Sequence, residues 1–364
     1  MKTRLVLLLS VCSIVSASDE SCQCFSDLPV KFKKFSKHYE GTVLLNGCIN
    51  DRSLDNVDAT KIQIGCNDFA ELEANFISDV EELLELVVGP CNLTKVQTCA
   101  FNRLPSLKTV VLSDNQLAAW PGGVFENVPN LQQIFLDSNK LRVVDEDAFT
   151  NLPHLKTVKL NNNKVQNLSR NWFSNSTSLT TLLLSHNRIE ELPVGMFLEL
   201  SKLNWLDFSW NRISVLHPTT FEGVASTVLH LNLEGNRIKQ LSRSMVPSTF
   251  TSELSLNFNL LNYLPNSFFM QLRVRRLYLQ GNPFTCPCED QINKQMSALG
   301  IWRRRSFSAS AKCNTKVLPT CAAVSTNRCI EAVDSVATQR FNDYIRRLGF
   351  RDTMDWAVTC QLTS

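Results

Sequence analysis

An eleven-residue phrase, Leu-x-x-Leu-x-Leu-x-x-Asn-x-Leu, recurs ten times in this chain of 364 residues, at a spacing of 24 that slips only to 25 and 23. Such a period is typical of a solenoid, in which each coil adds one short strand and buries its apolar side against its neighbours. We therefore predict an α/β solenoid over residues 59–285, built for binding. The phrase is anchored at Asn67, Cys91, Asn115, Asn139, Asn163, Asn187, Asn211, Asn236, Asn259 and Asn282.

The repeat predicts two buried ladders. The anchor asparagine should lie inside, where its amide can bond the backbone of its own and the adjacent coil, because buried backbone groups need partners. A second ladder lies ten residues after each anchor and should form an apolar spine on the convex side. Its members are Phe101, Phe125, Phe149, Phe173, Phe197, Phe221, Val246 and Phe269.

The residues between the strand leucines should point outward, because strand residues alternate faces. They would line a parallel sheet on the concave face of a curved horseshoe, and unlike the ladders they do not repeat. Some would form an apolar or aromatic surface and others a polar spot, although valine in a strand also merely suits a sheet and polar residues can simply be solvated. The candidate ligand-binding residues are Val87, Val111, Phe135, Lys159, Leu183, Trp205, Asp207, Trp210, His230, Asn232 and Tyr278.

The ends of the chain indicate an exported protein. Residues 1–17 read as a signal peptide, with basic Lys2 and Arg4, an apolar core and small residues before the cleavage site. Cleavage removes one of the thirteen cysteines, and the other twelve cluster at the two ends of the solenoid, which predicts disulfide-bonded caps with open connectivity. These cysteines are Cys22, Cys24, Cys48, Cys66, Cys91, Cys99, Cys286, Cys288, Cys313, Cys321, Cys329 and Cys360.

Charge and hydropathy exclude several classes of partner. Removing the two basic residues of the signal takes the formal charge from +3 to +1, which gives no reason to expect nucleic acid. No later apolar run approaches the ~20 residues that cross a bilayer. We therefore expect a secreted, extracellular protein without a membrane span. Three Asn-x-Ser/Thr motifs, at Asn92, Asn167 and Asn175, predict glycosylation away from the concave face.

Catalysis is not expected. It needs titratable groups brought together in a nucleophile or acid–base arrangement. The five histidines are scattered, and none has the spacing of a metal-ligand pair. We predict no catalytic, cofactor-binding or metal-binding residues.

The repeat phrase, with phenylalanine ten residues after the anchor, resembles the extracellular leucine-rich repeat family of Toll-like receptor ectodomains, variable lymphocyte receptors and secreted arthropod immune proteins. The segment from Asn282 to Cys288 looks like that family's C-terminal cap, which implies that Cys286 and Cys288 pair with later cysteines. Two features depart from the family: the cysteine spacing of the N-terminal cap, and a tail that continues beyond the C-terminal cap.

The predicted organisation is a signal peptide (1–17), an N-terminal cap (18–58), ten leucine-rich repeats (59–285), a C-terminal cap (286–329) and a tail (330–364). Phe341, Tyr344, Ile345 and Leu348 of the tail have helical spacing, which fits either a helix packed on the cap or one that binds a partner in a homo- or heterodimer.

The resemblance favours a secreted recognition protein that binds an extracellular protein or a surface glycan in innate immunity. A matrix or adhesion adaptor in development and a secreted enzyme inhibitor are the alternatives that remain open.

Overall fold

The computed structural model forms two compact units. Unit 1 extends to Lys159 and includes Asn171–Ser176, and unit 2 comprises Leu160–Arg170 and the chain from Thr177 onward. The predicted signal peptide lies outside the described residues. Those are residues 25–34, 40–47, 49–50, 54, 59–65, 70–224, 228–246, 252–270, 272, 274–301, 321–351 and 355.

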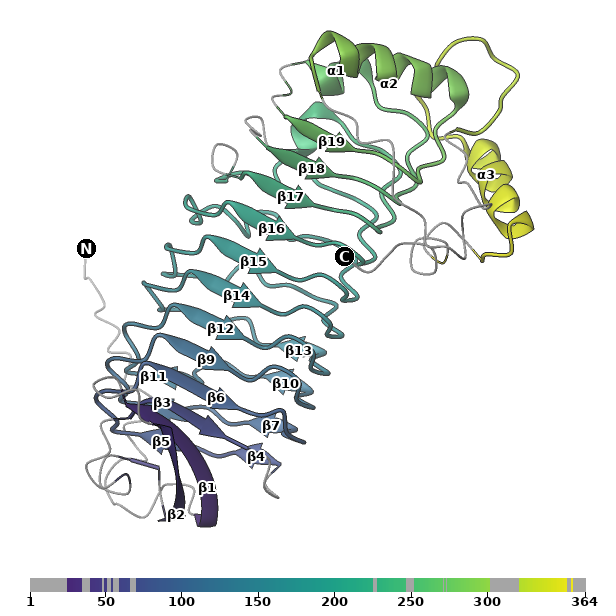
Figure 1. Ribbon diagram of the computed structural model, residues 1–364. Helices are drawn as coiled ribbons and strands as arrows, with labels where there is room; N and C mark the ends of the chain where they lie inside the picture. Colours follow the sequence, from purple (N-terminus) through teal and green to yellow (C-terminus); the bar gives the residue numbers. More distant parts are fainter. Residues whose placement is uncertain are drawn as a thin grey trace, which may run out of the picture. The chain divides into compact units, whose positions relative to one another are not determined.

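The main sheet of unit 1 begins with an antiparallel hairpin (Figure 1). Strand β1 (Phe25–Lys34) pairs with β2 (Glu40–Gly47) on one side and with β3 (Ala59–Ile64) on the other. The hairpin thus covers a strand edge that would otherwise be open to pairing with another chain. From β3 the strands continue in parallel, through β6 (Glu85–Val88), β9 (Thr109–Val111), β12 (Gln133–Phe135) and β14 (Thr157–Lys159).

Shorter strands complete the coils of unit 1. One small parallel sheet contains the first members of the phenylalanine spine, and two strand pairs lie elsewhere on the coils. The sheet is β5 (Ile77–Ser78), β8 (Phe101–Asn102) and β11 (Phe125–Glu126), and the pairs are β4 (Glu71–Leu72) with β7 (Lys95–Val96) and β10 (Ala119–Trp120) with β13 (Val143–Val144).

Unit 2 contains a second run of parallel strands, paired in chain order. The strands are β15 (Thr181–Leu183), β16 (Trp205–Asp207), β17 (His230–Asn232), β18 (Glu253–Ser255) and β19 (Arg276–Tyr278). A 3₁₀ turn, η2 (Arg243–Met245), and a short helix, α1 (Asn266–Phe269), lie between the later strands. The parallel strands of both units match the predicted α/β solenoid of repeats.

The anchor asparagines are buried, as predicted: the eight from Asn115 to Asn282 are each at most 8% exposed. Asn211 shows their bonding. Its Nδ2 donates to the carbonyl oxygens of Leu184, Phe208 and Ser209 at 2.9, 3.1 and 3.2 Å, and its Oδ1 accepts the N–H of Ile189 at 3.0 Å. Each such side chain therefore pairs backbone groups of two successive coils that no strand ladder reaches.

The predicted spine is also present. Phe101 stacks on Phe125 with ring centroids 5.4 Å apart, and Phe197 stacks on Phe221 at 5.8 Å. Phe125 differs from the other spine phenylalanines, which are at most 4% exposed, because its side chain is only half-buried.

Two disulfides close the C-terminal cap of unit 2. They join Cys286 to Cys321 and Cys288 to Cys329, from the first turn of α2 (Cys286–Ala298) to the segment that precedes the tail. The pairing implied by the family resemblance is therefore confirmed.

The remaining cysteine predictions have mixed outcomes. Cys99 is disulfide-bonded. The prediction for Cys91 is wrong, because its side chain is a buried thiol in the anchor position. The backbone N–H of Cys91 donates to Oδ1 of Asn115, the next anchor, at 3.0 Å. The other predicted disulfide cysteines, Cys22, Cys24, Cys48, Cys66, Cys313 and Cys360, lie outside the described residues.

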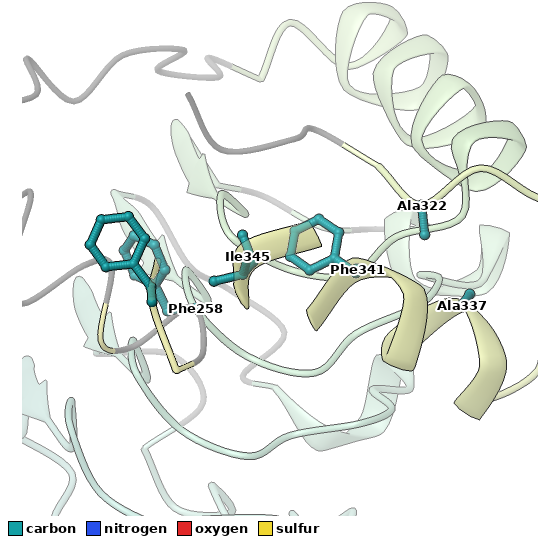
Figure 2. Packing of buried hydrophobic residues seen from close by; sticks show 6 residues of the cluster. Phe258, Ala322, Ala337, Phe341 and Ile345 are labelled. Atoms are coloured by element: carbon teal, nitrogen blue, oxygen red, sulfur yellow. The ribbon is translucent and has the colours of Figure 1, made fainter. Parts of the chain in front are cut away.

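The tail forms helix α3 (Ser335–Arg347), which packs against Ala322 of the predicted cap and Phe258 of the repeats in unit 2. Figure 2 shows Ala337, Phe341 and Ile345 in the cluster that contains Phe258 and Ala322. Asp334 caps the helix by accepting the Ala337 N–H at 2.8 Å. The interpretation of the tail as a packed helix is therefore correct for this apolar face.

We predict that Asn211→Ala lowers the free energy of unfolding, because it leaves buried backbone groups unpaired at about 1–3 kcal/mol each. Chemical denaturation followed by circular dichroism measures this loss. Gln166→Ala, which removes an exposed amide, is the control and should have little effect. Equal stability of the two variants would contradict the structural role of the ladder.

Candidate functional site

The outward residues of the parallel strands form what we call the strand face of each unit. In most strands the middle residue is buried and its neighbours are half-buried, so the residues at the first and third positions face outward. Nearly all predicted ligand-binding residues hold these positions. Because the rungs are in register, residues with no local sequence relation become neighbours.

In unit 1 the predicted apolar strip is assembled. Val87 lies opposite Val111, which lies opposite Phe135 on the next strand. All three are half-buried and face away from the core. Lys159, on the next rung, places its Nζ 4.5 Å from the centroid of the Phe135 ring, a cation–π contact. The strip therefore carries a positive charge at one end.

In unit 2 the strand face carries one row of aromatic and charged side chains. Trp205, His230, Glu253 and Arg276 lie at the same register on successive strands. The Trp205 and His230 rings stack with centroids 4.5 Å apart, His230 Nδ1 lies 3.4 Å from a Glu253 oxygen, and Arg276 pairs with Glu253. Trp205 remains 47% exposed, which makes it the open aromatic surface of this row.

A second row of unit 2 runs parallel to the first through Leu183, Asp207, Asn232, Ser255 and Tyr278. Asp207 therefore lies beside Asn232 while His230 lies beside Trp205, so the predicted polar spot is divided between two rows. All five side chains of this row are half-buried.

Asp207 is the electrostatically unusual residue of the strand face. Burial raises the pKa of its carboxyl group, against the lowering effects of hydrogen bonds from the side chain and the backbone N–H of Ser209 and of nearby His186. Burial in turn lowers the pKa of His186, so this neighbour does little to stabilise the carboxylate at neutral pH. In the part of the chain that the structure describes, no lysine or arginine forms an ion pair with Asp207.

The predicted position of Trp210 on the concave surface is wrong. Strand β16 ends at Asp207, and Trp210 follows it in a left-handed turn with φ of 57°. Its ring stacks on His186 at 5.7 Å and on Phe258 at 6.2 Å, and it packs against the α3 cluster. Strand alternation does not apply beyond the end of the strand, which explains the difference.

Some features were missed by the sequence interpretation. Glu253 and Arg276 complete the first row; their repeat positions place them among the outward strand residues, but they were not among the candidate ligand-binding residues. In unit 1 a cleft of about 820 Å³ opens beside the half-buried Phe125, between Arg103, Pro129 and Asp147. No predicted site residue lines this cleft.

The predicted glycosylation sites, Asn92, Asn167 and Asn175, are all exposed and lie outside the strands. Among the described residues, no cluster of histidine, cysteine or acidic side chains could hold a metal ion. No helix in the described ranges combines the length and apolar character that a membrane crossing requires.

Comparisons with known proteins agree with this architecture. The family described as leucine rich repeat matches residues 81–141, 129–189 and 177–238. Residues 81–238 therefore consist of leucine-rich repeats, and the fold of the chain resembles that of Toll-like ectodomains. A comparison with curated proteins found no match.

Solved structures with this fold include glycosylated Toll from Drosophila in its complex with Spatzle. Toll is 21% identical to this chain, with a TM-score of 0.60, and the alignment covers 66% of this chain and 34% of the Toll chain. Mouse RP105, in its complex with MD-1, matches at 22% identity and a TM-score of 0.58, covering 67% and 42%. The chain thus spans about a third to two fifths of the length of these structures. At such identities the likeness concerns the fold.

We predict that Asp207→Asn raises the melting temperature at pH 7. The pKa of the Asp207 carboxyl group is higher in the folded than in the unfolded state, so folding favours its protonated form. The resulting stabilisation is complete only below the unfolded-state pKa of about 3.9, and it is lost as pH rises through the folded-state pKa. The gain from the substitution should therefore disappear near pH 3. Calorimetry at both pH values tests this, with Glu253→Gln as the control that breaks an ion pair and should give no gain. A lower melting temperature for Asp207→Asn at pH 7 would contradict the assignment.

Proposed function

We propose that this chain is a secreted recognition protein of innate immunity that binds an extracellular protein through its strand faces. The observation that carries the proposal is the contrast between the interior and the outward positions of the same strands. The interior repeats the same leucines, asparagines and phenylalanines, whereas the outward positions follow no repeating pattern and hold a half-exposed tryptophan in a fixed stack.

Physical arguments support a protein as the partner. Aromatic residues fixed in place before binding lose little conformational freedom, and they often dominate the energy of protein interfaces. Trp205 and Phe135 meet this description, each held by a neighbour on the adjoining strand. Disulfides are typical of proteins outside the cell, which supports secretion.

The similar structures add an analogy. Toll is described in a complex with Spatzle, as a hub of development and innate immunity, and RP105 in a complex with MD-1. By this analogy the present chain would also bind a protein. Exposed Asn92, Asn167 and Asn175 would carry glycans outside the strands and leave the strand faces accessible.

We predict that Phe135→Asp and Trp205→Ala each weaken partner binding at least tenfold, while the melting temperature changes little because both side chains face outward. The measurement is capture of partners from extracellular fluid on the immobilised mature protein, followed by titration of the captured protein. Val215→Ser is the control, because Val215 is 67% exposed and lies outside the strands. Binding that survives in both folded strand-face variants would refute the proposal.

Expression addresses the biological setting. Induction of the protein by infection is expected for a role in immunity. Constant deposition in matrix without such induction would instead indicate an adhesion adaptor.

A further inference from the structure

We propose that the strand face of unit 2 binds an arginine side chain of the protein partner, with the guanidinium group against Trp205 and Asp207 and the aliphatic stem against Leu183. This inference rests on the proposed function and specifies the chemistry of one contact. It follows from three features of the two rows.

The first feature is the open face of Trp205. One side of its ring is covered by His230, at a centroid distance of 4.5 Å and an interplanar angle of 26°. On the other side the residue in register is Thr181, whose short side chain cannot cover an indole. The ring is therefore held in one orientation with a face available, and the face of tryptophan is the best aromatic surface for a cation.

The second feature is the uncompensated charge of Asp207. Glu253 on the same strand face is paired with Arg276, and Glu234 accepts hydrogen bonds from Ser255 Oγ at 3.1 Å and Asn257 Nδ2 at 3.0 Å. Asp207 accepts the Ser209 N–H at 2.9 Å but forms no ion pair with a described residue. A desolvated carboxylate gains most from a cation that a partner brings, because the interaction strengthens as the local dielectric falls.

The third feature is the spacing of these groups. Trp205 and Asp207 are two residues apart on β16, hence about 6.6 Å apart along the same face. Leu183 lies opposite Asp207 on β15 and offers apolar surface to an aliphatic stem. A planar guanidinium can stack on an indole while its N–H groups donate to a carboxylate, whereas the compact ammonium of lysine cannot do both as well.

The experiment uses the full mature protein with ¹⁵N-labelled tryptophan, and the probe is N-acetyl-arginine N-methylamide. The citrulline analogue is the matched neutral probe, since it has the same shape without the charge, and the lysine analogue tests the need for a planar group. The indole N–H signal of Trp205, assigned with Trp205→Phe, reports binding. We expect a saturable shift with arginine in the millimolar range, no shift with citrulline and weaker binding of lysine.

Two variants make the test specific. Asp207→Asn should weaken arginine binding at least fivefold, and the melting curve shows independently that this variant is folded. Glu191→Gln removes the same charge from an exposed position outside the strands and should leave arginine binding unchanged. The proposal is overturned if arginine gives no saturable shift, if citrulline or lysine binds as tightly as arginine, or if Asp207→Asn binds arginine as well as the parent protein.

These results are distinct from those of partner capture. Loss of capture in Trp205→Ala together with absent arginine binding would leave the strand face as the interface and remove only the arginine contact. Arginine binding with no effect of the strand-face variants on capture would refute the proposed function instead.

Discussion

The hydrogen bonds of the anchor asparagines are the constraint on which the rest of the structure depends. A chain that coils must turn after each short strand, and the turn leaves carbonyl and N–H groups buried without strand partners. One amide per coil pairs them, as Asn139 does with the carbonyl oxygens of Leu112 and Leu136 and with the N–H of Leu117. Because these bonds and the leucines fix the backbone, the outward strand positions need not contribute to the core.

The turns impose a second constraint, at the residue immediately before each anchor from Asn115 to Asn282. This position takes a left-handed conformation, with positive φ at Trp210, Gly235, Phe258 and Gly281. The aromatic rings alternate with glycines because a Cβ at Gly235 would lie 2.8 Å from the Trp210 ring and one at Gly281 would lie 2.3 Å from the Phe258 ring. The missing side chains let the rings lie over the following coil. The resulting aromatic surface is where α3 packs.

The period of 24 residues predicted the interior well because each buried position recurs with the same role. The period did not predict contacts between residues that the repeat does not relate. Asn262, for example, accepts the Asp334 N–H at 2.8 Å and bonds Thr338, contacts that span more than seventy residues and fix the start of α3. Trp210 was misplaced for a related reason, because its position depends on a turn conformation that the alternation of strand residues does not describe.

The strand faces of the two units differ in how their polar groups are compensated, and this difference bears on function. In unit 1, Lys61 pairs with Glu85 and Lys159 lies over Phe135, so its charges have partners within the face. In unit 2, Glu253 is likewise paired, yet Asp207 is buried enough to disfavour its ionised form and lacks a described cation. The Asp207 side chain accepts the Ser209 N–H, but a neutral amide oxygen could accept it as well, so folding alone gives no reason for a carboxylate there. A partner that supplies a positive charge would turn this cost into binding energy, which makes Asp207 the most informative position of the strand face.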